Sequence, residues 1–466
     1  MAINDTANQK PALIVTTLGA FVVPLMGSSI NIALPSIGKE FDMDALMLSW
    51  ITTSYLLTAA MFLVPFGRIA DIYGRKRIFL YGVLVYTLAS LLAVLSTSSS
   101  LLIVSRLFQG VGASMTFSNG VAILTSVYSM GEKGRVLGIN VAAVYAGLSC
   151  GPFLGGLLTH YLGWRSIFLI HIPAGLFILF YTFYKLKGEW AEAQGEHFSY
   201  KGSLFYSLVL LMVMVGLFQL PKPLGILFIL MGLFGMGLFV KWEMTSKSPV
   251  FQLTIFRNNR IFAFSNLAAL IHYSATFAVS FLLSLYLQFI KELRPHEAGL
   301  VLVSAPIMQA ILSPFAGKLS DRIDPRIVAS GGMAMTGLGL LFFVFIDEKT
   351  ALLWIIAFLI LLGIGFALFS SPNTNAVMGS IDKKFYGVAS GVLSTMRSIG
   401  MTFSMGFVMV FFSICIGRTQ ITPALHPLFL KSVRGTFIFF TFLCALAILA
   451  SLARGPSKSS SPNEAS

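Results

Sequence analysis

Two arginines stand inside long apolar stretches of this sequence, and their chemistry needs an explanation. Arg106 and Arg397 are flanked on both sides by apolar residues, whereas the acidic residues fall in predicted loops, tails or helix ends. An ionised group in hydrocarbon is costly, and it persists mainly where it faces a cavity or a partner. The two guanidinium groups therefore indicate a polar path through an apolar protein, as transport would require.

Histidine is the other candidate for chemistry in these stretches. His272 is followed by Tyr273 inside an apolar segment, and histidine can change its charge in the physiological pH range. His272 is thus a candidate proton carrier, although a hydrogen-bonded packing role fits the same position. His171 lies near the end of another apolar segment, and we expect it to pack.

The sequence shows no pattern for an enzyme or a metal site. Cys150, Cys415 and Cys444 lie far apart in apolar segments and match neither a disulfide framework nor a metal-binding motif. The apolar segments contain no Ser-His-acid or paired-carboxylate arrangement. We therefore expect no catalytic residues, no metal and no cofactor.

The composition indicates an all-α integral membrane protein. Of 466 residues, 56% are hydrophobic and 11% charged, whereas roughly a quarter of residues are charged in soluble domains. Apolar stretches of about 20 residues, enough for a helix to cross a bilayer, recur fourteen times. They are continuously apolar instead of alternating, which excludes a β-barrel. We place them at residues 12–34, 46–66, 79–96, 101–125, 135–160, 166–184, 202–220, 224–241, 261–287, 297–317, 327–345, 351–371, 386–416 and 433–452.

The basic residues predict the orientation of these spans. An even number of crossings puts both termini on one side, and most of the 32 Lys and Arg residues fall in loops on that side. The positive-inside bias therefore predicts cytoplasmic termini in a multi-pass protein of the inner (cytoplasmic) membrane. The same bias, together with the interaction of basic loops with anionic lipid headgroups, accounts for the net charge of +14. We therefore expect the lipid bilayer as a partner and no nucleic acid.

Polar segments and a weak repeat divide the chain into two related halves. Residues 1–190 are expected to form one six-helix bundle and 256–454 another, with a linker and two extra spans at 191–255 and a disordered tail at 455–466. The stretch Gly67–Arg77 follows the second span of the first half, and Gly317–Arg326 follows the second span of the other half. Duplicated halves would place related loops at these positions.

The first of these loops carries a recognisable signature. Its pattern G-R-x-A-D-x-x-G-R-K-R resembles the loop between helices 2 and 3 of the major facilitator superfamily. Gly67 would let two helix ends approach closely, and Asp71 could accept hydrogen bonds from a neighbouring helix N-terminus. The resemblance implies gating loops, whose candidate residues are Gly67, Arg68, Asp71, Gly74, Arg75, Asp321 and Arg322.

Two further motifs resemble proton-coupled exporters of that superfamily. Arg106 and Gln109 lie one turn apart within R-x-x-Q-G-x-G, where Gly110 and Gly112 thin the helix against a neighbour. The next span resembles the antiporter signature G-x-x-x-G-P-x-x-G-G, with Gly147, Gly151, Pro152 and Gly155. Their spacing forms a flat glycine face beside a helix-bending proline. Together with W-R-x-I-F at residues 164–168, these motifs are similar to the fourteen-helix drug:proton antiporter group.

The resemblance implies the major facilitator fold, with two six-helix bundles, two inserted helices and 14 transmembrane helices in total. It implies a small-molecule substrate and protons as partners, and we expect a monomer. The residues implied for transport and coupling are Arg106, Gln109, His272 and Arg397, and those implied for substrate binding are Asn31, Tyr55, Asn119 and Tyr273.

One departure from the group bears on function. Met26 stands where the group usually has an aspartate, and methionine cannot carry a proton. The leading hypothesis is a secondary active transporter of the multidrug efflux type, which exports amphipathic compounds or drugs in exchange for protons by alternating access. The alternative is a proton-uncoupled exporter or facilitator of an organic anion or metabolite. A membrane sensor or scaffold without transport would not need paired gating loops.

Overall fold

The structure is a computed structural model that describes residues 5–129, 132–246, 256–257, 259–381 and 386–455. Every regular element in this described part is helical. Fourteen of its helical segments are long and apolar enough to cross a membrane, which confirms the predicted number of spans. All but the first residue of the predicted tail 455–466 fall outside the described residues.

The first half of the chain supplies six spans. They are α1 (Asp5–Phe41), α2 (Ala45–Tyr73), α3 (Arg75–Val94), α4 (Ser99–Val127), α5 (Lys133–Leu162) and the pair α6 (Arg165–Leu169) and α7 (His171–Lys185). Polar side chains begin several of these helices: Asp44 accepts a hydrogen bond from the backbone N–H of Met47 at the start of α2, over 2.7 Å. α1 extends beyond its predicted span and contains three prolines, which neighbouring helices make tolerable in a membrane.

The second half supplies the insert and six more spans. The insert consists of α8 (Tyr200–Gln219) and α9 (Pro223–Thr245). The remaining elements are α11 (Arg260–Thr276), α12 (Val279–Leu285), a π-helical turn (Tyr286–Ile290), α13 (Pro295–Leu302), α14 (Ser304–Arg322), α15 (Pro325–Phe343), α16 (Leu352–Gly379), α17 (Tyr386–Cys415), a 3₁₀ turn (Pro423–Leu425) and α18 (His426–Ala453). α11 and α12 form the predicted span 261–287, and α13 and α14 form the span 297–317.

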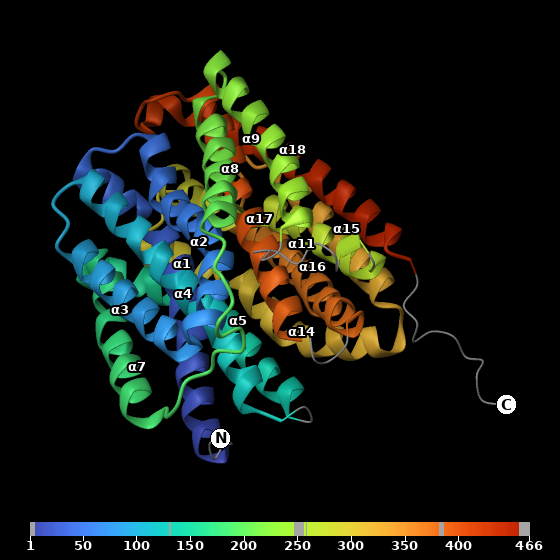
Figure 1. The fold of residues 1–466 in the computed structure, drawn as a ribbon. Coiled ribbons are helices and arrows are strands. Elements are labelled where there is room, and N and C mark those ends of the chain that lie inside the picture. Colours follow the sequence, from blue (N-terminus) through green and yellow to red (C-terminus); the bar gives the residue numbers. More distant parts are fainter. Residues whose placement is uncertain (1–4, 130–131, 247–255, 258, 382–385, 456–466) are drawn as a thin grey trace.

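Figure 1 shows the first-half helices on one side of the molecule and the second-half helices on the other. Within the first group, α1 packs on α5, and α4 packs on both α2 and α3. Within the second, α16 packs on α14 and α15, and α17 packs on α11. The insert lies along the seam, because α8 contacts both α2 and α17.

The two groups are joined most closely on the side opposite the termini, here called the distal side. There the hydroxyl of Ser284 donates to the carbonyl of Asn31 over 2.6 Å, and the Gln288 amide donates to the carbonyl of Ile32 over 3.0 Å. A single apolar core includes Ile30 of α1 and Phe281 of α12. The side nearer the termini has a separate core within the first group. The structure is therefore closed distally.

Candidate functional site

Arg397 lies at the seam between the two groups of helices. Its Nη2 donates to the hydroxyl of Thr374 over 2.8 Å, and its guanidinium lies 5.6 Å from the ring centroid of Tyr273. Its Nε is buried without a hydrogen-bond partner. The side chain belongs to α17, and its contacts come from α16 and α11, so three helices of the second half position it. An incompletely satisfied guanidinium can still bind an acceptor.

Tyr145 of α5 brings the first half of the chain to this cluster. Its hydroxyl is hydrogen-bonded to that of Ser370 on α16. One turn further along α5, Ser149 donates to the carbonyl of Pro306 over 3.1 Å, so polar contacts cross the seam twice. The sequence interpretation did not select Tyr145 or Ser370. Tyr145, two residues before Gly147, gave no separate motif signal, because only tertiary packing places it beside Arg397.

His272 completes what we call the seam cluster: Tyr145, His272, Tyr273, Ser370, Thr374 and Arg397. The His272 side chain is 3% exposed, and its ring lies on that of Phe369 with a centroid separation of 4.0 Å. Its Nδ1 has no hydrogen-bond partner. A buried imidazole with a free nitrogen is costly in isolation and can bind a ligand group or a proton. The predicted residues His272, Tyr273 and Arg397 are therefore brought together.

Arg106 lies elsewhere, and it is fully enclosed within the first group of helices. Its Nε donates to the carbonyl of Ile51 over 3.0 Å, and its Nη1 donates to Gln109 Oε1 over 2.6 Å. The guanidinium sits 4.4 Å from the ring centroid of Tyr55, and the residue has 0% exposure. The expectation that Arg106 stands without a protein partner is therefore wrong for this conformation, because packing of α2 on α4 gives its Nε and Nη1 partners, whereas its Nη2 is buried without one.

Asn31, Tyr55 and Asn119 do not join the seam cluster. Asn31 accepts from the hydroxyl of Thr52 over 3.3 Å and belongs to the distal closure. Tyr55 stacks against Arg106, as described above. Asn119 donates back to the carbonyl of Met115 over 2.6 Å within α4. Of the four residues predicted to bind substrate, the structure places only Tyr273 beside Arg397.

His171 packs between two helices and contacts a backbone carbonyl with each ring nitrogen. Its Nδ1 lies 2.6 Å from the carbonyl oxygen of Ile167, and its Nε2 lies 3.1 Å from that of Val22. A carbonyl oxygen only accepts hydrogen bonds, whereas a neutral imidazole has only one N–H to donate. The ring joins α7 to α1, in agreement with the packing role expected from the sequence.

The glycine face of α5 packs against α1. A Cβ atom at Gly155 would meet the Cα of Ser29 at 2.8 Å, so the helices approach too closely for a side chain. Ser29 then donates from its hydroxyl to the carbonyl of Gly151 over 2.9 Å. This agrees with the predicted close contact, and Gly147 faces α1 in the same way. Pro152 lies within α5 without ending it.

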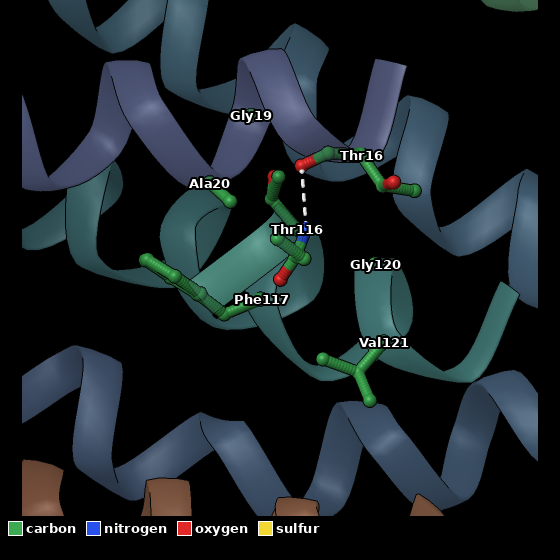
Figure 2. Close-up of a pocket in the computed structure, with 8 residues that line it drawn as sticks. Thr16, Gly19, Ala20, Thr116, Phe117, Gly120 and Val121 are labelled. Atoms are coloured by element: carbon green, nitrogen blue, oxygen red, sulfur yellow. Dashed lines mark hydrogen bonds between the residues drawn. The ribbon is translucent and has the colours of Figure 1, made fainter. Parts of the chain in front are cut away.

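A small cavity lies near this packing, between α1, α4 and α5. It has a volume of about 10 Å³, which is room for roughly one water molecule. Figure 2 shows Thr16, Thr116 and Phe117 around it, with the carbonyl of Thr16 accepting a hydrogen bond from the Asn140 amide, which is 3.2 Å long. A cavity of this size does not hold an amphipathic substrate.

The loop between α2 and α3 is held by the segment that follows α7. Arg75 pairs with Asp71 at 2.7 Å and forms two further bonds to Glu192, at 2.6 and 3.0 Å. Arg68 pairs with Glu196 at 2.5 Å. The predicted gating residues Arg68, Asp71 and Arg75 thus contact the linker in this conformation, and the sequence interpretation had not assigned the linker acids to them.

Two details of this loop correct the sequence interpretation. Glu189, and not Asp71, caps the N-terminus of α3, where it accepts from the N–H groups of Lys76 at 2.7 Å and Arg77 at 3.1 Å. Gly74 is the glycine that the geometry requires: its φ is +118°, and a Cβ there would meet Glu189 Cγ at 2.6 Å. At Gly67 a Cβ would find an ordinary contact of 3.6 Å, so no close approach explains that residue.

The related loop after α14 forms a different ion pair. Asp324 Oδ2 pairs with Arg326 Nε at 3.2 Å, and Asp324 also caps α15 by accepting from the N–H of Arg326. Arg322 is exposed at the end of α14. The side chain of Asp321 lies outside the described part of the structure. The gating role predicted for Asp321 and Arg322 stays a prediction.

Comparison with known proteins identifies the family. A family model of the Major Facilitator Superfamily matches residues 16–405 and, in a second match, 265–466. The chain belongs to this superfamily. It is a multi-pass membrane transporter and not an enzyme. The two matches overlap, and the later one begins in the second half of the chain. Related halves would produce such a pattern.

Individual members of the superfamily show which relatives it resembles. The riboflavin transporter RibZ of Clostridioides difficile is 30% identical over 88% of this chain and 89% of its own length. The multidrug resistance protein Stp of Mycobacterium tuberculosis is 32% identical over 86% of this chain and 75% of its own. The structure of the human organic anion transporter MFSD10 superimposes with a TM-score of 0.61, covering 95% of this chain and 99% of that one at 14% identity, which supports the fold alone.

Proposed function

We propose that this transporter exports amphipathic compounds from the cytoplasm in exchange for protons. Substrate binds at the seam cluster, and the two helix groups rock about it so that the cluster is exposed first to one side of the membrane and then to the other. Relatives named for multidrug resistance and drug efflux support the export of drugs. The assignment of binding and coupling to Arg397 and His272 is part of this proposal.

The observation that carries the proposal is the position of Arg397. Its guanidinium lies where helices of both halves meet, with its Nε unpartnered and the unpartnered Nδ1 of His272 in the same cluster. Tyr145 reaches this cluster from the other half. Alternating access requires polar groups that can bind a substrate and that lie between two helix groups able to move relative to each other.

Charge in the cluster favours anionic or neutral substrates over lipophilic cations. The helices that supply it, α5, α11, α16 and α17, contain no Asp or Glu. A guanidinium in a low-dielectric surrounding attracts anions strongly and repels cations. The rings of Tyr273 and Phe369 add flat apolar surface, so an aromatic molecule with an acceptor group fits best.

A second candidate, transport without proton coupling, is favoured by Met26. This residue has 0% exposure in α1 and stands where the related exporters usually carry an aspartate. The riboflavin transporter among the relatives is named for a neutral metabolite, so such a substrate is also consistent with the family. In this candidate the protein is an exporter or facilitator of an organic anion or metabolite.

The remaining parts of the proposal concern organisation. We assign residues 1–190 and 256–454 to the two bundles and 191–255 to the linker and insert, with a monomer as the working unit. Both termini lie in the cytoplasm and the protein resides in the inner membrane, as the excess of basic residues in the loops on the side of the termini supports. The distal side then faces outward.

The test uses purified full-length protein in proteoliposomes with an imposed pH gradient. Uptake is measured for riboflavin, an anionic aromatic dye and a quaternary ammonium dye, with a pH-sensitive fluorophore recording proton movement. Proton release on substrate addition supports antiport, whereas flux indifferent to the gradient supports the uncoupled candidate. Preference for the quaternary ammonium dye contradicts the assigned charge selectivity.

Arginine variants separate the cluster from general effects of charge. Arg397→Ala removes the guanidinium from the seam, and we expect loss of uptake. Arg418→Ala is the matched control, because Arg418 is exposed beyond the distal end of α17 and lies outside the seam cluster. Equal uptake by the two variants would contradict the role of Arg397.

A further inference from the structure

Two histidines from different halves of the chain meet at the distal side of the seam. His160 lies in the last turn of α5, and His296 lies in the first turn of α13. Their ring centroids are 4.2 Å apart, with the ring planes inclined at 46°. They are separated by more than a hundred residues in sequence, so only the closure of the two helix groups brings the rings into contact.

Backbone packing holds the two rings in place. A Cβ at Gly156 would lie 2.9 Å from the Cα of His296 and 2.7 Å from the carbonyl oxygen of Pro295. Gly299, one turn further along α13, packs in the same close manner on the backbone of Pro152. Because α5 and α13 touch through backbone atoms, the rings cannot move far apart unless the helices separate.

The polar groups of the rings are poorly satisfied in this contact. His296 Nδ1 is buried and has no hydrogen-bond partner. Tyr161 lies beside both histidines, with ring centroids 4.7 Å from His160 and 6.2 Å from His296. Aromatic contact of this kind suits neutral imidazoles. It offers no hydrogen-bond acceptor to a protonated imidazole ring.

Charged groups of the surrounding elements are engaged with other partners. Glu297 of α13 accepts from the backbone N–H of Arg294 over 2.8 Å. Glu40 at the end of α1 pairs with Arg165 at 2.7 Å. Lys291, after the π-helical turn, donates to the carbonyl of Glu348 in the loop before α16.

The exposed charges nearest in sequence are Lys39 on α1 and Glu292 and Arg294 before α13, so two of the three are basic. Histidine is the side chain whose charge ordinarily changes between about pH 5 and 8.

We propose that His160 and His296 form a pH-sensitive latch that closes the distal side when both rings are neutral and opens it when both are protonated. Two imidazolium rings at this separation repel each other, and the contact offers them no counter-ion. His160 is already exposed, and separation of α5 from α13 removes that repulsion and exposes the buried Nδ1 of His296 to water. With the distal side outward, acid outside the cell favours the outward-open state.

This inference rests on the proposed function for its role in the transport cycle. Protonation after the distal side has opened would hold it open for substrate release. Return of these protons to the outer solution would then allow the seam to close. The latch therefore sets the state of the distal side in response to outside pH and does not itself carry protons across the membrane.

The test measures the distance across the distal side by electron spin resonance in lipid nanodiscs. Full-length protein carries spin labels at L95C, directly after α3, and at L353C on α16, both exposed, with the three native cysteines replaced by alanine. We expect the distance distribution to shift toward longer values from pH 8 to pH 5. We expect His160→Gln and His296→Gln each to abolish the shift, and His426→Gln, at the distal start of α18, to retain it.

A charge-reversing variant guards against damage to the fold. His160→Glu places a carboxylate against His296, so acid should create an attractive pair and shift the distribution toward shorter distances. A distribution independent of pH in the unsubstituted histidine background, or a full shift in His296→Gln, overturns the latch. If the distance shifts with pH but proteoliposome flux does not depend on the pH gradient, the latch is supported and proton exchange is contradicted. Proton-driven flux without any shift in the distance contradicts the latch alone.

Discussion

Arg75 and Glu192 form a two-pronged ion pair across 117 residues of sequence, with Nη1–Oε1 and Nη2–Oε2 distances of 2.6 and 3.0 Å. Glu192 belongs to the linker, whereas Arg75 begins α3. The backbone directly before the linker adds to the contact, because the N–H of Arg75 donates to the carbonyl of Trp190 over 2.9 Å. The linker therefore fixes the position of the loop that the sequence identifies as a gate.

The two partners of this pair should differ in their effect on stability. The Glu192 side chain is 66% exposed, so solvent screens its charge, and Glu192→Gln should cost no more than about 1 kcal/mol. Arg75→Ala also removes the partner of Asp71 and should cost about 2 kcal/mol. Thermal unfolding of the two variants in one detergent measures both, and an equal loss would show that the linker pair alone accounts for the effect.

Arg106 should stabilise the packing of the first group of helices. Arg106→Ala removes donors to the Ile51 carbonyl and to Gln109 and leaves a space under Tyr55, so we expect a loss of about 3 kcal/mol in unfolding free energy. Gln109→Ala leaves the arginine in place and should cost less, about 1–2 kcal/mol. Denaturation followed by intrinsic fluorescence compares them; a fully stable Arg106→Ala protein that fails only in transport would support direct coupling instead.

The sequence predicted the spans well and the site only in part, for physical reasons. Hydrocarbon demands about 20 apolar residues per crossing, so span number follows from local composition. Contacts such as Tyr145 with Ser370 depend on how two helix groups meet, and no periodicity in α5 signals them. Arg106 shows the converse. Its apolar surroundings correctly indicated an unusual charge, but its partner, the backbone carbonyl of Ile51, cannot be predicted from a pattern of side chains.

Two glycines of α5 should respond oppositely to the same substitution. At Gly155 a Cβ would meet Ser29 at 2.8 Å, so Gly155→Ala forces α5 away from α1 and should cost about 1–3 kcal/mol. At Gly138 nothing lies within 4 Å, and alanine is the better helix former by roughly 1 kcal/mol. Gly138→Ala should therefore leave stability unchanged or raise it. Melting temperatures in detergent decide this, and equal losses would refute the packing explanation.

The hydrogen bond between Tyr145 and Ser370 should contribute to holding the two halves together. Tyr145→Phe and Ser370→Ala each remove one hydroxyl from the seam, while the rings and helices remain. Because the Tyr273 hydroxyl also bonds to both of these groups, the double variant should lose more than either single one but less than their sum, with a coupling energy of about 1 kcal/mol. The matched control is Ser149→Ala, whose hydroxyl bonds to a backbone carbonyl and should add independently to Tyr145→Phe. Unfolding free energies of the single and double variants give both couplings, and additive losses for Tyr145→Phe with Ser370→Ala would show that this bond does not join the halves.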